Sequence, residues 1–198
     1  MNRTVTLVKT AYEPGQLGPY ERPQVALAGR SNVGKSSLIN ALCGNRRLAK
    51  ISSTPGKTRS VNFYDVEPGG WQLVDLPGYG YARCSKTERA KWARLIEGYL
   101  ADNPLLAGVA VLLDSRLEPQ KLDLEMTAFL GASRIPMLAV LTKADKCKQR
   151  DRSKRQRQWR DILGLDRDPL LFSAKTGMGS GALWRALESA AVGEVPED

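Results

Sequence analysis

Residues 25–43 read VALAGRSNVGKSSLINALC, and this stretch decides the fold. The apolar run from Val25 to Gly29 predicts a buried strand, and the segment from Ser36 to Cys43 predicts a helix. Between them, residues 29–36 (GRSNVGKS) fit the pattern G-x-x-x-x-G-K-[ST] in the strand–loop–helix context that this pattern requires. The alternative interpretation is a glycine-rich turn that fits the pattern by chance, but such a turn would not be expected between a strand and a helix. We therefore predict a phosphate-binding loop.

The residue types of this loop suit phosphate groups. Glycines let the backbone wrap around an anion, so that successive amide N–H groups point inward, and the following helix adds positive potential at its N-terminus. The amino group of Lys35 is expected to reach the β- and γ-phosphates, and the hydroxyl of Ser36 is a hard oxygen ligand for Mg2+. The loop thus predicts a magnesium–nucleotide site but does not choose between ATP and GTP.

Strand-like and helix-like segments alternate along the rest of the chain. Short apolar strands separated by helices predict an α/β fold with a mostly parallel sheet, covered by helices on both faces. A hairpin from Ser60 to Asp75 makes one edge strand antiparallel, residues 1–23 either add an edge strand or are loose, and residues 1–198 form one domain. The other predicted strands are Gly108–Asp114, Ile135–Thr142 and Leu170–Ser173, and the predicted helices are Lys86–Ala101, Pro119–Leu130, Ser153–Leu163 (with Ser153 as N-cap) and Ala182–Ala191.

The tetrapeptide Thr142-Lys143-Ala144-Asp145 follows a predicted buried strand at the sheet edge where α/β proteins bind ligands. A carboxylate here can accept hydrogen bonds from both N1–H and the exocyclic amine of guanine. Adenine lacks that amine, and its N1 is an acceptor, so Asp145 would reject it. The aliphatic stem of Lys143 can cover the base. A helix N-cap is the alternative role, and the position after a phosphate loop favours reading of the base.

Each of three further segments is weak evidence for a nucleotide site by itself. Their order along the chain, together with the phosphate-binding loop, supports such a site. Asp75 closes a predicted strand, where it can hold Mg2+ through a water, and the amide of Gly78 can contact the γ-phosphate. Thr58 offers a second hydroxyl for Mg2+, with Thr54 as the alternative. The backbone amides of residues 173–175 (SAK) can meet the guanine O6.

Composition excludes several kinds of chemistry. The chain has no histidine, which excludes a Ser-His-Asp triad, a Cys-His dyad and a histidine metal site. Its three cysteines lie far apart and form no Cys-x-x-Cys pair, so we expect reduced thiols and no zinc site. The apolar runs fall well short of the roughly 20 residues that cross a bilayer, and no targeting segment is visible. We therefore expect a cytoplasmic protein without a membrane partner.

The formal net charge is +9, which favours a polyanionic partner such as RNA, DNA or an anionic membrane surface. The charge is concentrated in one segment, because nine basic and two acidic residues lie between Lys143 and Arg160. A solvated helix face is the alternative interpretation. The basic residues are Lys143, Lys146, Lys148, Arg150, Arg152, Lys154, Arg155, Arg157 and Arg160.

All five nucleotide segments occur in order across residues 29–175, and the chain resembles the translation-factor-like P-loop GTPases. Within them it resembles the EngB/YihA group of ribosome-biogenesis GTPases. The strings that carry this resemblance are GRSNVGKSS (29–37), TPGKT (54–58), NFY (62–64), DLPGYGYA (75–82), TKAD (142–145) and FS (172–173). The resemblance implies a three-layer, Ras-like G domain and a cytoplasmic bacterial GTPase that acts in large-subunit assembly and is needed for normal cell division and septation.

The resemblance also assigns site residues. Ser36 and Thr58 bind Mg2+, with Asp75 acting through water, and Lys35 and Asn32 support the transition state or an ion. The last segment continues as Ala174-Lys175-Thr176-Gly177, which leaves its exact backbone contact open. The nucleotide-binding set comprises Gly29, Arg30, Ser31, Asn32, Val33, Gly34, Lys35, Ser36, Ser37, Gly56, Lys57, Thr58, Arg59, Ser60, Asp75, Leu76, Pro77, Gly78, Thr142, Lys143, Ala144, Asp145, Phe172, Ser173 and Ala174.

Many GTPases place a glutamine directly after the D-x-x-G segment to orient water, and here that position is Tyr79. We therefore predict slow GTP hydrolysis that an activating partner or K+ near Asn32 accelerates. We expect a monomer that binds the large ribosomal subunit or its precursor through rRNA contacts of the segment from Lys146 to Arg160. Two alternatives stay open: a GTP-dependent protein-interaction module in cell division, and a P-loop nucleoside or nucleotide kinase.

Overall fold

A computed structural model describes residues 3–49, 60–80 and 86–193. They form an α/β fold around a seven-stranded sheet with the order β1-β3-β4-β2-β5-β6-β7. The predicted fold class is confirmed. The strands are β1 (Thr4–Ala11), β2 (Gln24–Gly29), β3 (Val61–Glu67), β4 (Trp71–Asp75), β5 (Leu106–Asp114), β6 (Met137–Thr142) and β7 (Leu170–Leu171). The helices are α1 (Lys35–Leu42), α2 (Lys86–Ala101), α3 (Lys121–Ala132), α4 (Gln149–Leu163) and α5 (Ser180–Val192), with short 3-10 turns at Pro14–Gln16 and Ala144–Lys146.

The sheet is parallel from β4 through β2, β5 and β6 to β7 and antiparallel at its other edge. β3 and β4 form the predicted hairpin, with Asn62 opposite Asp75. β1 pairs antiparallel with β3 and forms the edge of the sheet, so the hairpin strand β3 is the second strand and not the edge strand. The carboxyl ends of the parallel strands meet at one edge of the sheet, and the segments predicted to bind nucleotide follow these ends.

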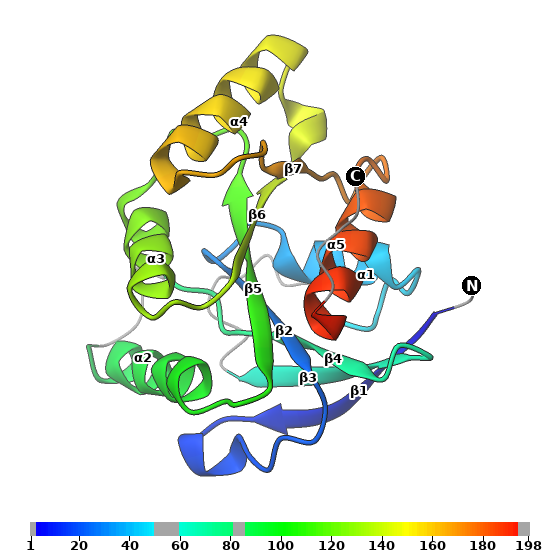
Figure 1. Cartoon of the computed structure of the whole chain (residues 1–198), viewed down its shortest axis with the longest axis vertical. Coiled ribbons are helices and arrows are strands. Elements are labelled where there is room, and N and C mark those ends of the chain that lie inside the picture. Colours follow the sequence, from blue (N-terminus) through cyan, green and yellow to red (C-terminus); the bar gives the residue numbers. More distant parts are fainter. Residues whose placement is uncertain (1–2, 50–59, 81–85, 194–198) are drawn as a thin grey trace.

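Side chains on the two faces of the sheet pack into separate apolar clusters, which gives three layers (Figure 1). On one face, Leu95 and Tyr99 of α2, Leu130 of α3 and Trp159 of α4 cover the sheet. On the other face α1 and α5 cover it, and their apolar residues include Leu38 and Leu183. The helix predicted over Lys86–Ala101 is confirmed, and Leu95, Ile96, Tyr99 and Leu100 form its buried apolar stripe.

The predicted start of the basic helix is wrong. α4 begins at Gln149 with Lys148 as its N-cap residue, and Ser153 lies inside the helix. The amides of Asp151 and Arg152 both donate to the carbonyl of Lys148 at 3.0 Å. The first turn carries no apolar residue, so hydrophobic periodicity could not detect it, although its long polar residues are good helix formers. Asp151 in this turn also suits the helix dipole.

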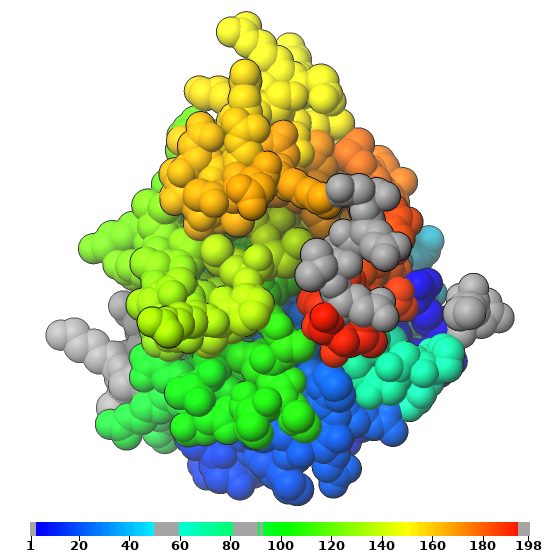
Figure 2. Space-filling model, in the orientation of Figure 1, coloured from blue at the N-terminus to red at the C-terminus, as the bar shows by residue number. Residues whose placement is uncertain are grey.

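Only some of the basic side chains in the predicted segment from Lys143 to Arg160 are exposed. Arg155 is 7% exposed, and its guanidinium donates to both carboxylate oxygens of Glu118, at 2.5 and 2.9 Å. Arg160 donates to Asp168, Lys143 donates to the carbonyl oxygen of Asn32, and the half-buried Arg152 donates to the carbonyl oxygen of Cys147. Five exposed cations remain, and we call them the α4 basic face: Lys146, Lys148, Arg150, Lys154 and Arg157. Figure 2 shows residues 143–168, in yellow to orange, at one end of the molecule.

In the part of the chain that the structure covers, no helix has both the length and the apolar character to cross a bilayer.

Candidate nucleotide-binding site

The phosphate loop connects β2 to α1. Gly34, with φ +110°, is the N-cap residue of α1, and Asn32 has φ +64°. Both values lie in the left-handed region, which glycine adopts without strain and asparagine tolerates. A Cβ on Gly29 would lie 2.8 Å from Val33 Cγ1 and 3.1 Å from the carbonyl oxygen of Leu112, so a side chain there would push the loop off the sheet. The local sequence thus fixes a tight loop at a helix N-terminus.

The carboxyl end of β6 braces this loop. Lys143 Nζ donates to the carbonyl oxygen of Asn32 at 2.6 Å and to Asp114 Oδ2 at 2.8 Å. Thr142 Oγ1 donates to the carbonyl oxygen of Val33 at 2.8 Å. The segment predicted to read the base is therefore tied directly to the segment predicted to bind phosphates.

Asp114 is a site residue that the sequence analysis missed. Burial alone would raise the pKa of its carboxyl, but hydrogen bonds from Arg116 and Lys143 outweigh burial and lower the pKa to about 2. The carboxylate is therefore charged at neutral pH and anchors the Lys143 amino group. One signal was available, because Asp114 ends a buried strand, β5, that is the direct neighbour of the phosphate-loop strand β2.

Lys35 and Asp75 form a buried ion pair, with side chains that are 7% and 2% exposed. Lys35 is the first residue of α1, and Asp75 is the last residue of β4. The pair brings together the predicted phosphate ligand and the predicted second-sphere ligand of Mg2+. Ser36 follows in the same helical turn, so one hydroxyl and one carboxylate, both hard oxygen donors, lie beside the loop. This donor set fits Mg2+.

The D-x-x-G segment lies against the phosphate loop. The amide of Tyr79 donates to the carbonyl oxygen of Gly29 at 3.2 Å, and the amide of Ser31 donates to the carbonyl oxygen of Tyr79 at 2.8 Å. A Cβ on Gly78 would approach Ser31 Cα and N to 3.2 Å. Glycine at this position therefore lets two backbone segments touch.

The loops that follow β6 and β7 are joined around Asp145. Ser173 Oγ donates to Asp145 Oδ1 at 2.6 Å and accepts the amides of Lys175 and Thr176 at 3.2 Å. The amide of Ala144 donates to the carbonyl oxygen of Phe172 at 3.1 Å. The Phe172 side chain is 1% exposed and packs in the core with α5. Only its backbone can therefore face a ligand.

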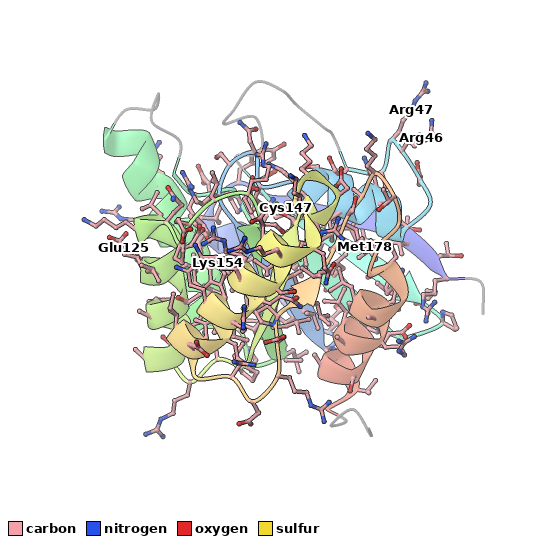
Figure 3. All side chains as sticks on the ribbon, turned by 90° about the horizontal axis from the view of Figure 1, so that it is seen from above. Arg46, Arg47, Glu125, Cys147, Lys154 and Met178 are labelled. Carbon is pink, nitrogen blue, oxygen red and sulfur yellow. The ribbon has the colours of Figure 1, made fainter. Side chains whose placement is uncertain are left out.

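The described members of the predicted site gather at the carboxyl edge of the parallel strands β2, β4, β6 and β7, the edge seen from above in Figure 3. Ser60 is buried at the start of the hairpin, where its hydroxyl donates to Asn62 Oδ1 at 3.3 Å. The predicted residues Gly56, Lys57, Thr58 and Arg59, as well as Thr54, lie outside the described residues.

The arrangement matches known proteins. Residues 24–143 match the family model described as "50S ribosome-binding GTPase". A probable GTP-binding protein EngB of Oleidesulfovibrio alaskensis is 58% identical over 198 residues, which cover 100% of this chain and 90% of that protein. The crystal structure of a probable GTP-binding protein EngB superposes with a TM-score of 0.71 at 23% identity, covering 86% of this chain and 100% of that one.

The crystal structure of Era in complex with MgGDPNP and nucleotides 1506–1542 of 16S ribosomal RNA has a TM-score of 0.70 at 21% identity, covering 91% of this chain and 59% of that one. At such identities the two structures show the shared fold, whereas the family follows from the sequence matches. The chain therefore belongs to the EngB family of GTP-binding proteins and is a P-loop GTPase that binds and hydrolyses GTP.

Proposed function

We propose that this GTPase is a Mg2+-dependent switch that acts in the cytoplasm, as a monomer, in assembly of the large ribosomal subunit. Normal cell division and septation would then depend on it. The observation that carries the proposal is the match of residues 24–143 to a family described by its 50S ribosome binding. The exposed cations of α4 support it, because rRNA is a polyanion.

The nucleotide would lie along the carboxyl edge of the sheet. The phosphate loop and Lys35 would hold the phosphates, and Asp145 would read guanine with the carboxylate oxygens that Ser173 leaves available. Ser36 and Thr58 would hold Mg2+ directly, and Asp75 would hold it through water. Bound Mg2+ supplies positive charge that neutralises the phosphates. Lys35 would exchange its partner Asp75 for the nucleotide, which couples phosphate binding to the D-x-x-G segment.

We further propose that K+ near Asn32 accelerates hydrolysis, because Tyr79 lacks the amide group with which a glutamine orients water. The Asn32 side chain is exposed at the loop. GTP hydrolysis should be at least about tenfold faster in KCl than in NaCl of equal ionic strength, and Asn32→Ala should abolish that difference. Asn45→Ala, at an exposed asparagine after α1, should leave it intact. Equal rates of the wild type in the two salts would refute the idea.

The α4 basic face would be the rRNA footprint. Arg150, Lys154 and Arg157 follow one another at helical spacing and so share one side of α4, opposite the buried Arg155 and Trp159. Of these three cations only Lys154 pairs with Glu118, with its Nζ 3.8 Å from Glu118 Oε1, and the Lys154 side chain is still 68% exposed. Clustered cations of this kind contact phosphates without reading sequence.

Co-sedimentation with purified large subunits tests the ribosomal role. With a GTP analogue present, affinity should fall on the order of a hundredfold between about 50 and 200 mM salt if about five phosphates are contacted. Charge reversal at Lys148, Arg150 and Arg157 should weaken binding and flatten this salt dependence. Arg155 is unsuitable for this purpose, because its reversal would leave a buried, repelled charge beside Glu118.

The matched control is charge reversal at Arg46 and Arg47, which project into solvent beyond α1 (Figure 3). It reverses two exposed cations, against three on the α4 basic face, and should leave subunit binding nearly unchanged. Binding that ignores both salt and the α4 substitutions would refute the rRNA footprint. Absence of binding to subunits in both nucleotide states would instead favour a protein partner in division.

A further inference from the structure

A side chain of the D-x-x-G loop is tied to a helix that carries none of the nucleotide motifs. Tyr79 Oη donates to Asp123 Oδ1 at 2.9 Å. Asp123 lies in the first turn of α3 and is 4% exposed. Burying a carboxylate costs free energy unless it is paired, so the hydrogen bond from Tyr79 stabilises the buried Asp123. The same hydrogen bond restrains the loop that carries Tyr79.

Residues 78–80 are held between the phosphate loop and α3. On one side lie the two backbone hydrogen bonds of Tyr79 with Gly29 and Ser31. On the other side, Gly80 with φ +82° packs so closely on Leu122 of α3 that a Cβ would lie 2.7 Å from Leu122 Cδ1. The Tyr79–Asp123 hydrogen bond is the polar contact of this second side. Together the contacts fix the segment next to Gly78.

The protonation states suit this arrangement. Burial and the nearby Asp123 raise the pKa of Tyr79 well above its usual value, so its hydroxyl is a stable donor at neutral pH. Burial raises the pKa of Asp123, whereas the hydrogen bond from Tyr79 and the positive charge of Arg30 oppose this, and Asp114 adds repulsion. Arg30 Nε is buried and finds no hydrogen-bond partner in the described ranges, so Arg30 acts on the pair as a neighbouring charge.

We propose that Asp123 is a positioning residue for GTP: by holding Tyr79, it keeps the amide of Gly78 beside the phosphate loop. The inference rests on the proposed contact between Gly78 and the γ-phosphate. GDP lacks that phosphate, so the tyrosine–aspartate hydrogen bond strengthens binding of GTP and leaves binding of GDP alone. A merely structural hydrogen bond would affect both nucleotides alike. Asp123 thus links α3 to the discrimination between the two nucleotide states.

The test compares the dissociation constants of a non-hydrolysable GTP analogue, GMPPNP, and of GDP by competition with fluorescent mant-GDP. Tyr79→Phe removes only the hydroxyl, and Asp123→Ala removes the acceptor. Each should weaken GMPPNP about tenfold, as expected for one hydrogen bond to a carboxylate, and change GDP by less than about twofold. The double variant should be no weaker than either single variant, because both remove the same interaction.

Tyr99→Phe is the matched control, since Tyr99 Oη donates to Gln24 Oε1 at 2.9 Å in the core, away from the loop. It removes a similar buried hydrogen bond and should leave the ratio of the two dissociation constants unchanged. Gly78→Ala tests the underlying contact, because its Cβ would push the segment off Ser31 and weaken GMPPNP selectively.

Three results would overturn the proposal. Loss of GMPPNP affinity in Gly78→Ala but not in Tyr79→Phe would leave the Gly78 contact standing and refute the role of Asp123. Equal losses for GMPPNP and GDP in Tyr79→Phe would show a structural hydrogen bond only. If Gly78→Ala also spares GMPPNP, the γ-phosphate contact itself fails, and the inference fails with it. Subunit binding does not enter this assay, so the ribosomal proposal is tested separately.

Discussion

Gly179→Ala is expected to destabilise the protein by more than about 4 kcal/mol, a large part of the total stability of a typical domain. Gly179 is the N-cap residue of α5 and has φ +77°. A Cβ there would overlap the carbonyl oxygen of Leu171 and come within 3.0 Å of its carbonyl carbon. Leu171 belongs to β7, and the pairing of β7 with β6 prevents the Leu171 backbone from moving away from the new Cβ.

The consequence reaches the site, because β7 leads directly into the loop around Asp145. Phe172 donates its amide to the carbonyl oxygen of Leu141, and Ser173 accepts the two amides that shape the loop. Separating α5 from β7 should therefore weaken both the fold and guanine binding. Urea unfolding followed by circular dichroism and by tryptophan fluorescence measures the loss, since Trp184 lies in α5.

Gly177→Ala is the matched control. Gly177 also has a left-handed φ, +76°, but a Cβ there would have nothing within 4 Å. Its cost should be that of the backbone conformation alone, about 1–2 kcal/mol. If the two alanine variants lose the same stability, the close approach of Gly179 to β7 does not determine the stability of this region.

Local patterns predicted the parts of the fold that depend on local physics. The phosphate loop needs glycines at fixed spacing between a strand and a helix, and each of these signals lies within 19 residues of sequence. The apolar strands and the stripe of α2 follow from burial on one or two faces. The first turn of α4 was not predicted because it has no buried residue and so no hydrophobic pattern. Its stability comes from helix propensity and backbone hydrogen bonds instead.

The missed residues act through contacts between distant segments. Asp114 anchors Lys143, 29 residues later in the chain, and Asp123 holds Tyr79, 44 residues earlier. Arg155 looked like one more surface cation, but Glu118 pairs with it from a loop 37 residues away. A count of charges along the sequence cannot distinguish a buried, paired arginine from an exposed one. The fold must first bring the partners together.

Asp145→Asn is expected to lower the affinity for GTP by on the order of a hundredfold or more. The carboxylate would offer two acceptors to the N1–H and amine of guanine, and hydrogen bonds to a charged group are stronger than neutral ones. Asparagine keeps one oxygen, which Ser173 Oγ can still donate to, and presents an NH2 group that repels the guanine donors. The same NH2 group suits the extra carbonyl of xanthine, so the variant should gain affinity for xanthine nucleotides.

The controls separate base reading from loss of charge and from loss of the site. Asp151→Asn removes one negative charge from the exposed first turn of α4 and should leave nucleotide choice unchanged. Lys35→Ala should weaken binding of all nucleotides alike, because we propose that the lysine binds the phosphates and not the base. Its buried partner Asp75 would also lose its ion pair, so its stability must be measured alongside.

The most direct test is competition of GTP, ATP and xanthosine triphosphate against mant-GDP for the wild type and against mant-labelled xanthosine diphosphate for Asp145→Asn. We predict that the wild type binds GTP and rejects ATP, and that the variant prefers the xanthine nucleotide. Equal binding of ATP and GTP by the wild type, or an undiminished guanine preference in the variant, would contradict the assignment of Asp145 as the residue that reads the base.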